Sequence, residues 1–318
     1  MKLLKREEEQ RGFLPVETLN LLYNLLTTIL IIIFYNRLQH PQDMLYSHFI
    51  IVITTFFLVY LYTRYPSPAI RLIRIVTQMS LLTYWYPETF EFNRIFPNLD
   101  HIFAQMEFSI FGCQPAILFE QALSGNIWRE LFNLGYWSYY PMIATVCFWY
   151  FFKEKKEVGR CTFIIQCSFF IYYIIFIFLP VAGPQFYFPV IGYDIANTGP
   201  YPAINNYFDL FPNIPGPQAD KEGFFTSLVN LAHALGERPT AAFPSSHIGI
   251  TVILLIFAFK SNKKLGWALT PLSLLLCCAT VYIKAHYLID SFAGIISGIL
   301  VYALTSYIYN ILSKRELV

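Results

Sequence analysis

Residues 287–312 read YLIDSFAGIISGILVYALTSYIYNIL, a run in which Asp290 is the only charged residue. A helix needs about 20 consecutive apolar residues to cross the hydrocarbon core of a bilayer, so this stretch is long enough to span one. Further apolar runs of similar size lie near residues 18–38, 46–63, 129–152, 160–182, 244–260 and 265–284. The sequence therefore predicts an all-α integral membrane protein.

The composition of the whole chain supports the same conclusion. The 318 residues are 56% hydrophobic and only 13% charged, whereas an ordinary soluble domain is about 45–50% apolar and about 25% charged. So few charges cannot cover a soluble enzyme of this size, and a net charge of +2 provides no basic surface for nucleic acid. The composition argues against a soluble enzyme, a disordered protein and a nucleic-acid binder.

Basic residues between the apolar runs predict how the spans are oriented, because short basic loops stay cytoplasmic. They form five groups: Lys2, Lys5, Arg6 and Arg11; Arg64, Arg71 and Arg74; Lys153, Lys155, Lys156 and Arg160; Lys260, Lys263 and Lys264; Lys314 and Arg315. All five groups fall on one side only if a weaker run near residues 70–88 is also a span. We therefore expect a bundle of about eight transmembrane helices with both termini in the cytoplasm.

Two longer segments then fall on the non-cytoplasmic side. The first is residues 89–128, in which residues 99–111 show apolar and polar side chains at roughly helical spacing, which predicts interfacial helices. Their Asp100, His101 and Glu107 are expected on a solvated face, with contact to lipid headgroups as the alternative. Residues 183–243 form an outer loop rich in proline and aromatic residues, which we expect to be ordered against the membrane interface.

Ionisable residues at the ends of apolar spans are costly there and mark candidate functional sites. Two clusters lie on the expected non-cytoplasmic side, ERPTAAFPSSH at residues 237–247 and KAHYLID at residues 284–290. A proline and two serines, Ser245 and Ser246, predict a helix start, whose free N–H groups and dipole favour an anion. Arg238 can donate two hydrogen bonds to a phosphate, and the glutamate before it is a candidate counter-ion.

The second cluster complements the first. His286 and Asp290 are spaced i, i+4, so they face the same side of a helix, and a carboxylate bonded to one ring nitrogen makes the other more nucleophilic. Lys284 adds a cation, with a snorkelling membrane anchor as its alternative role. Together with His247, in the first turn after the serines, these groups suit phosphoryl transfer through a phosphohistidine.

These residues resemble the type 2 phosphatidic acid phosphatase (PAP2) superfamily of membrane lipid phosphatases and phosphotransferases. The superfamily pattern is lysine, six residues and Arg-Pro; then Pro-Ser-Gly-His; then Ser-Arg, five residues, His, three residues and Asp. The matching positions are Arg238-Pro239, then Pro244-Ser245-Ser246-His247 with Ser246 in place of glycine, then His286 and Asp290. The resemblance implies N-terminal transmembrane helices and an interfacial segment in residues 1–128, and a PAP2-type catalytic core of helices in residues 129–318.

Besides Ser246, the chain departs from this pattern at three positions. Leu231 stands where the first lysine belongs, and Ala279 and Thr280 stand in place of Ser-Arg. Two phosphate-binding cations of the full pattern are therefore absent. Lys284 is a candidate replacement for one of them, and His233 is a second, whose charge depends on pH.

The resemblance implies a role for each matched residue. His286 attacks phosphorus while Asp290 holds its ring, and His247 protonates the leaving alcohol and then activates the acceptor. The phosphate oxygens are stabilised by helix-start amides and by Arg238, Lys284, Ser245 and Ser246. No cofactor or metal is required, and the sequence contains no acidic cluster suited to magnesium.

Residues 183–187, GPQFY, and 286–290, HYLID, further resemble the branch that contains inositol phosphorylceramide synthases and related bacterial proteins. The expected function is that of a membrane lipid phosphatase or phosphotransferase whose partners are a phosphorylated lipid and the bilayer. With water as acceptor the protein is a phosphatase, and with a lipid or polyol hydroxyl it is a transferase such as an inositol phosphorylceramide synthase. A transporter is the remaining alternative, but the charges gather at one membrane face rather than at the midplane.

Overall fold

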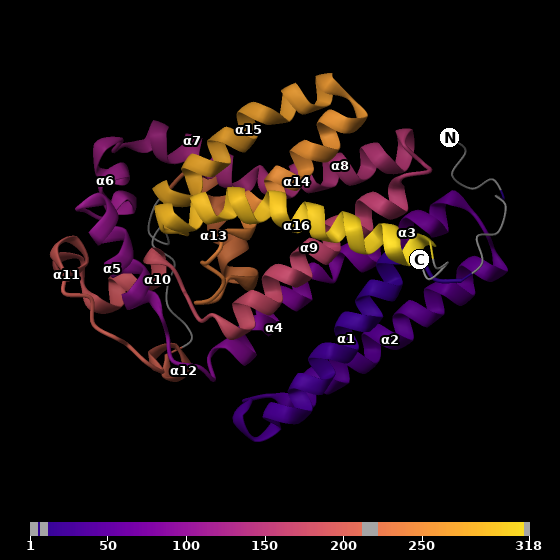
Figure 1. The fold of residues 1–318 in the computed structure, drawn as a ribbon, viewed down its shortest axis with the longest axis horizontal. Coiled ribbons are helices and arrows are strands. Elements are labelled where there is room, and N and C mark those ends of the chain that lie inside the picture. The colour runs from indigo at the N-terminus through magenta and orange to yellow at the C-terminus, as the bar shows by residue number, and fades with distance from the viewer. Residues whose placement is uncertain (1–5, 7–11, 212–221, 315–318) are drawn as a thin grey trace. The chain divides into compact units, whose positions relative to one another are not determined.

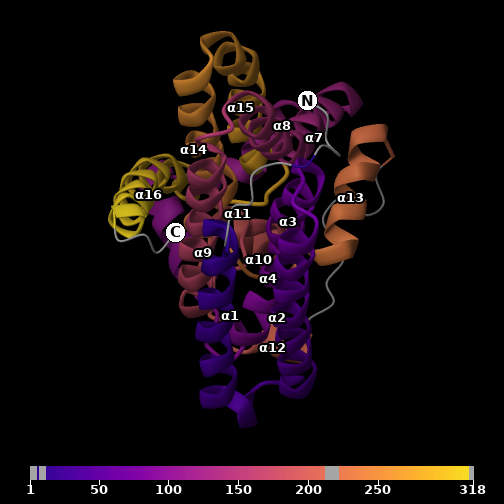
Figure 2. The same ribbon diagram turned by 90° about the vertical axis from the view of Figure 1, so that its right-hand side faces the viewer.

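The computed structural model describes residue 6 and residues 12–211 and 222–314, and every regular element in these ranges is a helix (Figures 1 and 2). The prediction of an all-helical protein is therefore confirmed for the described residues. The chain divides into two compact units, one drawn from residues 1–88, 147–170 and 302–318 and the other from 89–146 and 171–301. The division predicted at residue 128 stays a prediction. Four of the basic residues used to orient the chain lie outside the described ranges: Lys2, Lys5, Arg11 and Arg315.

The first unit begins with two long helices that run side by side (Figure 2). These are α1 (Pro15–Phe34) and α2 (Pro41–Arg64), joined through the short 3-10 helix η1 (Tyr35–Arg37). A third helix, α3 (Pro68–Ser80), packs against both. Its N-terminus is capped by Ser67, whose side chain accepts a hydrogen bond from the Ile70 N–H, the interaction that satisfies a free donor at a helix start.

Buried polar side chains connect the helices of this unit. Arg74 donates to both carboxylate oxygens of Glu17, at 2.7 and 2.6 Å, and both side chains are inaccessible to solvent. Arg74 therefore lies inside a helix and not in a loop, and its position on the cytoplasmic side stays a prediction. His48 and Glu88 form a second buried pair at 2.7 Å. Pairing of this kind is what makes ionisable groups tolerable among apolar helices.

The second unit contains the helices that surround the predicted site. They are α5 (Asp100–Phe111), α6 (Pro115–Ala122), α7 (Asn126–Trp137), α10 (Pro184–Ile191), α11 (Tyr193–Thr198), α12 (Tyr207–Leu210), α13 (Phe224–Gly236), α14 (Ser246–Ser261) and α15 (Lys263–Tyr282). Four helices have residues in both units, α4 (Leu82–Asn93), α8 (Tyr139–Lys153), α9 (Val158–Phe178) and α16 (Leu288–Lys314).

Five helical segments of the described chain are long and apolar enough to cross a membrane: residues 15–37, 41–64, 158–178, 263–282 and 288–314. Helices α5 and α6 are bent by 65° at a short break and would add a sixth, as a broken span or a re-entrant loop. The run near 70–88 is divided between α3 and α4, and the run near 129–152 between α7 and α8. A bundle of eight spans therefore stays a prediction.

Close packing of α14 against α16 fixes the position of the predicted helix start. Asn262 separates α14 from α15 in the hairpin visible in Figure 1 and caps α15 through the N–H groups of its first turn. A Cβ on Gly298 would lie 2.7 Å from the carbonyl oxygen of Gly249, and one on Gly294 would lie 2.8 Å from that of Ser245. Small residues four apart allow helix backbones to approach this closely in membranes.

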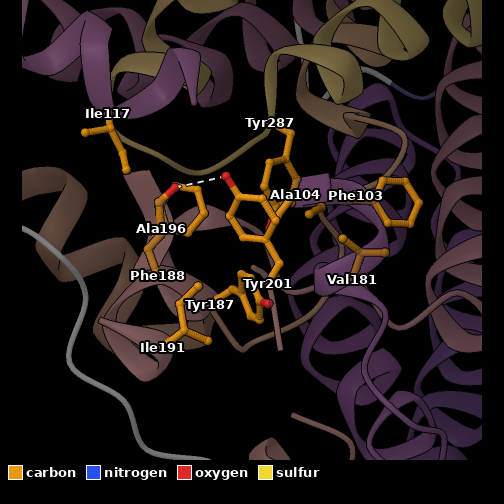
Figure 3. Packing of buried hydrophobic residues seen from close by; sticks show 11 residues of the cluster. Phe103, Ala104, Ile117, Val181, Tyr187, Phe188, Ile191, Ala196, Tyr201 and Tyr287 are labelled. Carbon is orange, nitrogen blue, oxygen red and sulfur yellow. Dashed lines mark hydrogen bonds between the residues drawn. The ribbon is translucent and has the colours of Figure 1, made fainter. Parts of the chain in front are cut away.

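The outer loop packs on a buried cluster that also contains a residue of the second motif. The cluster comprises Phe103, Ala104, Ile117, Val181, Tyr187, Phe188, Ile191, Ala196, Tyr201, Ala242 and Tyr287 (Figure 3). The Tyr201 hydroxyl donates to the Ala196 carbonyl at 3.2 Å. Residues 183–211 are thus folded against this cluster, whereas their place at the membrane interface on the outer side stays a prediction. Residues 212–221 of the same loop, which include the turn-rich stretch 212–217, lie outside the described residues.

We expect Gly298→Val to lower the midpoint of thermal unfolding in detergent. The new side chain would push α16 away from Gly249, and overpacking of this kind costs about 1–3 kcal/mol. Ile299→Val is the matched control, because Ile299 is 54% exposed and contributes little to packing. Equal midpoints for the two variants would contradict the close approach of the helices.

Candidate active site

The two predicted clusters lie together in the second unit. Ser245 is the N-cap of α14, and its side chain accepts a hydrogen bond from the Ile248 N–H at 3.4 Å. Its own N–H donates to the Asp290 carbonyl at 3.1 Å, which ties the start of α14 to the start of α16. Within the described part of the chain, the backbone N–H groups of Ser246 and His247 have no acceptor. The predicted helix start is therefore confirmed, and it presents two free donors.

His286 lies in the turn between α15 and α16 and is almost fully buried. Its Nδ1 lies 2.7 Å from the Ala242 carbonyl oxygen. Because a carbonyl can only accept, Nδ1 must carry the proton, and the lone pair is on Nε2. Burial lowers the pKa of His286 to about 4, although the bond to Ala242 and the charge of Glu237 act to raise it. The imidazole is therefore neutral near pH 7.

His247 faces this lone pair. Its Nδ1 is 3.4 Å from the Nε2 of His286, so the N–H of His247 is the donor in this contact. The ring also packs against Tyr136 of α7, with centroids 4.8 Å apart, and against Tyr139 of α8, with centroids 4.6 Å apart. Two aromatic rings thus hold the second histidine beside the first.

Asp290 hydrogen-bonds to the backbone of the turn and not to the His286 ring, the partner that its i, i+4 spacing predicted. One of its oxygens accepts the Tyr287 N–H at 2.8 Å and so caps the first turn of α16. The same oxygen is 3.7 Å from the His286 Nδ1, beyond hydrogen-bonding distance. The direct orienting partner of His286 is the backbone carbonyl of Ala242, and Asp290 contributes the cap.

The two predicted cations have different surroundings. Arg238 is half-buried, and its guanidinium makes no hydrogen bond or ion pair with any residue in the described ranges. Lys284 is buried and forms an ion pair with Glu120 of α6, with its ammonium 5.6 Å from the centre of the Tyr193 ring. Arg238 is therefore available to an anion, whereas Lys284 already has a carboxylate partner.

The glutamate before Arg238 has a different partner from the one predicted. Glu237 accepts a hydrogen bond from Gln185 at 2.6 Å and forms an ion pair with His233, with the two atoms also 2.6 Å apart. Burial by itself would raise the pKa of Glu237, but His233 and Gln185 lower it to about 2. The expected pairing of Glu237 with Arg238 is absent from the described part of the structure.

Both site loops contain a residue with an unusual backbone. Ala241 has φ 72° and Lys284 has φ 66°, in the left-handed region that costs a residue with a Cβ about 1–3 kcal/mol. Gly183 has φ 95°, and a Cβ there would lie 2.6 Å from the Ala285 carbonyl oxygen. Strain of this kind gathers at functional sites, and here it accompanies the turns that carry the histidines.

Comparison with protein families confirms the relationship that the motifs indicate. The model of the PAP2 superfamily matches residues 111–304, a range that includes both histidines and Arg238. The chain belongs to the PAP2 superfamily. Comparison with curated proteins and with solved structures gave no match. Members of the PAP2 superfamily are generally phosphatases or phosphotransferases, which supports a phosphatase-type function in a protein with several apolar helices.

The positions where this PAP2 chain departs from the pattern supply no cation. Leu231 is 55% exposed on α13, and Thr280 is buried with its hydroxyl 3.4 Å from that of Ser291. His233, the other candidate replacement, is bound to Glu237. Among the described residues no group of three or more His, Cys, Asp or Glu could hold a metal ion.

Two acidic residues outside the predicted site support its loops. Asp100 is fully buried and accepts the N–H groups of Ala182 and Gly183, at 2.7 and 2.8 Å, and the Tyr287 hydroxyl at 3.0 Å. Glu107, also fully buried, accepts the Ile289 N–H at 3.2 Å in the first turn of α16. The expectation of a solvated face for these two residues is wrong. The sequence did indicate that these two residues are buried and paired, because both lie in an apolar stretch, where an ionisable side chain needs partners.

We expect Asp100→Asn to destabilise the PAP2 core much more than Tyr287→Phe. The amide would turn a donor toward backbone N–H groups, and hydrogen bonds to a buried charge are worth about 1.5–3 kcal/mol each. Tyr287→Phe removes one hydroxyl and is expected to cost about 1–2 kcal/mol. Thermal unfolding in detergent compares the two, and equal losses would show that Asp100 does not anchor these loops.

Proposed function

We propose that this PAP2 protein is a membrane enzyme that removes or transfers a phosphate-containing group on a lipid through a covalent intermediate on His286. The observation that carries the proposal is the pair of imidazoles, with His286 Nε2 and His247 Nδ1 3.4 Å apart, beside the free N–H groups of α14. A half-buried arginine, Arg238, lies in the same motif segment. These are the parts that phosphoryl transfer needs: a nucleophile, an acid and donors for the phosphate oxygens.

The reaction would proceed in two displacements. In the first, the lone pair of His286 Nε2 forms a bond to phosphorus while the bond to the leaving oxygen breaks. His247 in its imidazolium form gives its proton to that oxygen. In the second, the acceptor hydroxyl loses its proton to His247 and attacks phosphorus, and the N–P bond breaks. Both histidines then return to their starting forms.

The hydrogen bond to Ala242 supports the role of His286, because it leaves the reactive lone pair on the nitrogen that faces the site. Reacting atoms approach to about 3–3.5 Å before a bond forms. A phosphoryl group therefore cannot fit between two nitrogens that are 3.4 Å apart. Substrate binding must turn one of the rings, and we propose that it is His247, since His286 is fixed through Nδ1.

Donors for the phosphate oxygens come from α14 and the segment before it. The N–H groups of Ser246 and His247 lack acceptors in the described structure and stand at the positive end of a helix. We assign Arg238 and the hydroxyls of Ser245 and Ser246 to the same oxygens. Lys284 can bind the phosphate oxygens only if its ammonium leaves Glu120 or contacts Glu120 and the phosphate at the same time.

The position of the site along its helices supports a lipid substrate on the non-cytoplasmic face. Helix α15 is a candidate span of 20 residues, about 30 Å long. It runs from the basic turn at residues 260–264 to the turn that carries His286. Since basic short loops stay cytoplasmic, we propose that the site opens at the outer leaflet and that both termini are cytoplasmic.

A transferase is the second candidate, and one observation favours it. The segment at residues 183–187, which resembles the inositol phosphorylceramide synthase branch, adjoins the turn that carries His286. Gln185 donates its N–H to the Lys284 carbonyl at 2.8 Å, and Gly183 closely approaches Ala285. A branch-specific segment in this place is suited to binding an alcohol acceptor.

His286→Ala is expected to abolish turnover while the unfolding midpoint in detergent stays near that of the wild type. His247→Asn is expected to slow turnover about 10²–10⁴-fold, the contribution typical of an acid–base group. With ³²P-labelled phosphatidic acid, the His247 variant should accumulate acid-labile, base-stable label on His286. Wild-type turnover in His286→Ala would overturn the proposed function.

The acceptor is identified by product analysis with purified protein. Labelled phosphatidic acid and labelled phosphatidylinositol are each incubated with and without ceramide. Free phosphate from phosphatidic acid regardless of ceramide indicates a phosphatase. A ceramide-dependent phosphorylated lipid from phosphatidylinositol indicates a transferase.

The acid limb of the pH–rate profile should reflect His286. Its pKa is lowered to about 4, so the neutral nucleophile predominates above that pH and is lost as the pH falls through it. We expect kcat/KM to decline with a midpoint near pH 4. A midpoint at the ordinary histidine value of about 6.5 would contradict the buried, neutral state of His286.

A further inference from the structure

Building on the proposed function, we propose that Glu237 is a positioning residue for His247. Its carboxylate, clamped by His233 and Gln185, stabilises the imidazolium form of His247 that the first displacement consumes. No part of the superfamily pattern includes Glu237, His233 or Gln185. The inference rests on three features of the second unit: the clamp, its connection to both histidines, and the charges around His247.

The clamp holds the carboxylate from two sides. His233 Nε2 lies 2.6 Å from one oxygen of Glu237, and Gln185 Nε2 donates to the other oxygen at 2.6 Å. The side chains of His233 and Glu237 are only 12% and 13% exposed. One short hydrogen bond and one close ion pair to a largely buried carboxylate restrict it to one position.

The clamp connects to both histidines of the site. The Tyr136 ring packs against His233 on one side, with centroids 6.3 Å apart, and against His247 on the other, with centroids 4.8 Å apart. Gln185 connects to the second histidine, because its N–H bonds the Lys284 carbonyl two residues before His286. Glu237 is therefore fixed relative to both imidazoles.

The charges around His247 explain why a carboxylate is needed there. The titratable groups that face this ring are Tyr136 of α7, Tyr139 of α8, His233, Glu237 and His286. Of these, Glu237 alone carries negative charge near neutral pH, since its pKa is lowered to about 2. His247 itself contributes to lowering that pKa, which shows that the two groups interact. Burial lowers the pKa of His247 to about 3, and the charge of Glu237 acts against this shift.

His233 has the opposite electrostatic effect. Burial lowers the pKa of His233, but the carboxylate of Glu237 raises it above the ordinary value overall. A protonated His233 partly cancels the charge that Glu237 presents to His247. Removing the carboxylate and removing the His233 ring should therefore change the proton affinity of His247 in opposite directions. If the clamp had a purely structural role, the two substitutions would not shift the proton affinity of His247 in opposite directions.

The test measures the titration of His247 directly, without a substrate. Full-length protein labelled with ¹⁵N at histidine is titrated in detergent by NMR, and the His247 signal is assigned by its absence in His247→Asn. Glu237→Gln should lower the titration midpoint by about half a pH unit or more, and His233→Asn should raise it. Glu237→Asp should restore most of the wild-type midpoint. Glu222→Gln, which removes an exposed carboxylate of the same outer segment, should leave it unchanged.

A second readout is the rate of turnover. It is measured with whichever of labelled phosphatidic acid and labelled phosphatidylinositol the wild-type protein uses. Glu237→Gln should shift the alkaline limb of kcat/KM to lower pH, because the proton donor is lost earlier. Unchanged midpoints in Glu237→Gln and His233→Asn would overturn this inference even if His286→Ala is inactive. Full activity of His286→Ala would instead overturn the proposed function. The NMR titration alone would then decide whether Glu237 and His247 interact electrostatically.

Discussion

The hydrogen bond from His286 Nδ1 to the Ala242 carbonyl determines what the rest of the site can do. It joins two segments that are 44 residues apart in sequence and determines which nitrogen of the buried imidazole carries the proton. A second bond, from the Ser245 N–H to the Asp290 carbonyl, runs in the opposite direction between the same segments. The two bonds keep a helix N-terminus and a nucleophilic nitrogen in register, and backbone groups make three of the four contributions. Of the side chains, only that of His286 takes part in these two bonds directly.

This arrangement needs support because both segments are short turns, and the support comes from buried carboxylates. Asp100 and Glu107 stand on α5 and accept N–H groups from the loop before α10 and from the first turn of α16. A buried carboxylate without partners is costly, so each of these groups stabilises only the arrangement in which its donors are in place. Displacing either turn would leave buried carboxyl oxygens without their hydrogen-bond donors. In this way an apolar protein obtains rigid loops from a few buried carboxyl groups.

The sequence predicted the parts of the fold that depend on local pattern. The helix start at Ser245 and Ser246 follows from a proline and two hydroxyl residues before an apolar run, and the neighbouring motifs place the histidines correctly. Partners that are distant in sequence could not be predicted in this way. Lys284 pairs with Glu120, 164 residues away, and Arg74 with Glu17. A count of charges indicates that such residues need partners, but only packing determines which ones they obtain.

The scarcity of cations at the site also has a physical explanation. Within the described site, the guanidinium of Arg238 has no ion-pair partner, whereas the other predicted cation is paired. The superfamily pattern has two further cations that this chain lacks. Free N–H groups at a helix start stabilise phosphate oxygens without adding a charge that must be desolvated when no anion is bound. A site built on such dipoles tolerates the carboxylate of Glu237 nearby, because the two oxygens of that carboxylate are bound by His233 and Gln185. In the proposed mechanism, the negative charge of Glu237 favours protonation of His247 while the helix dipole favours binding of the anion, so different groups meet the two requirements of phosphoryl transfer.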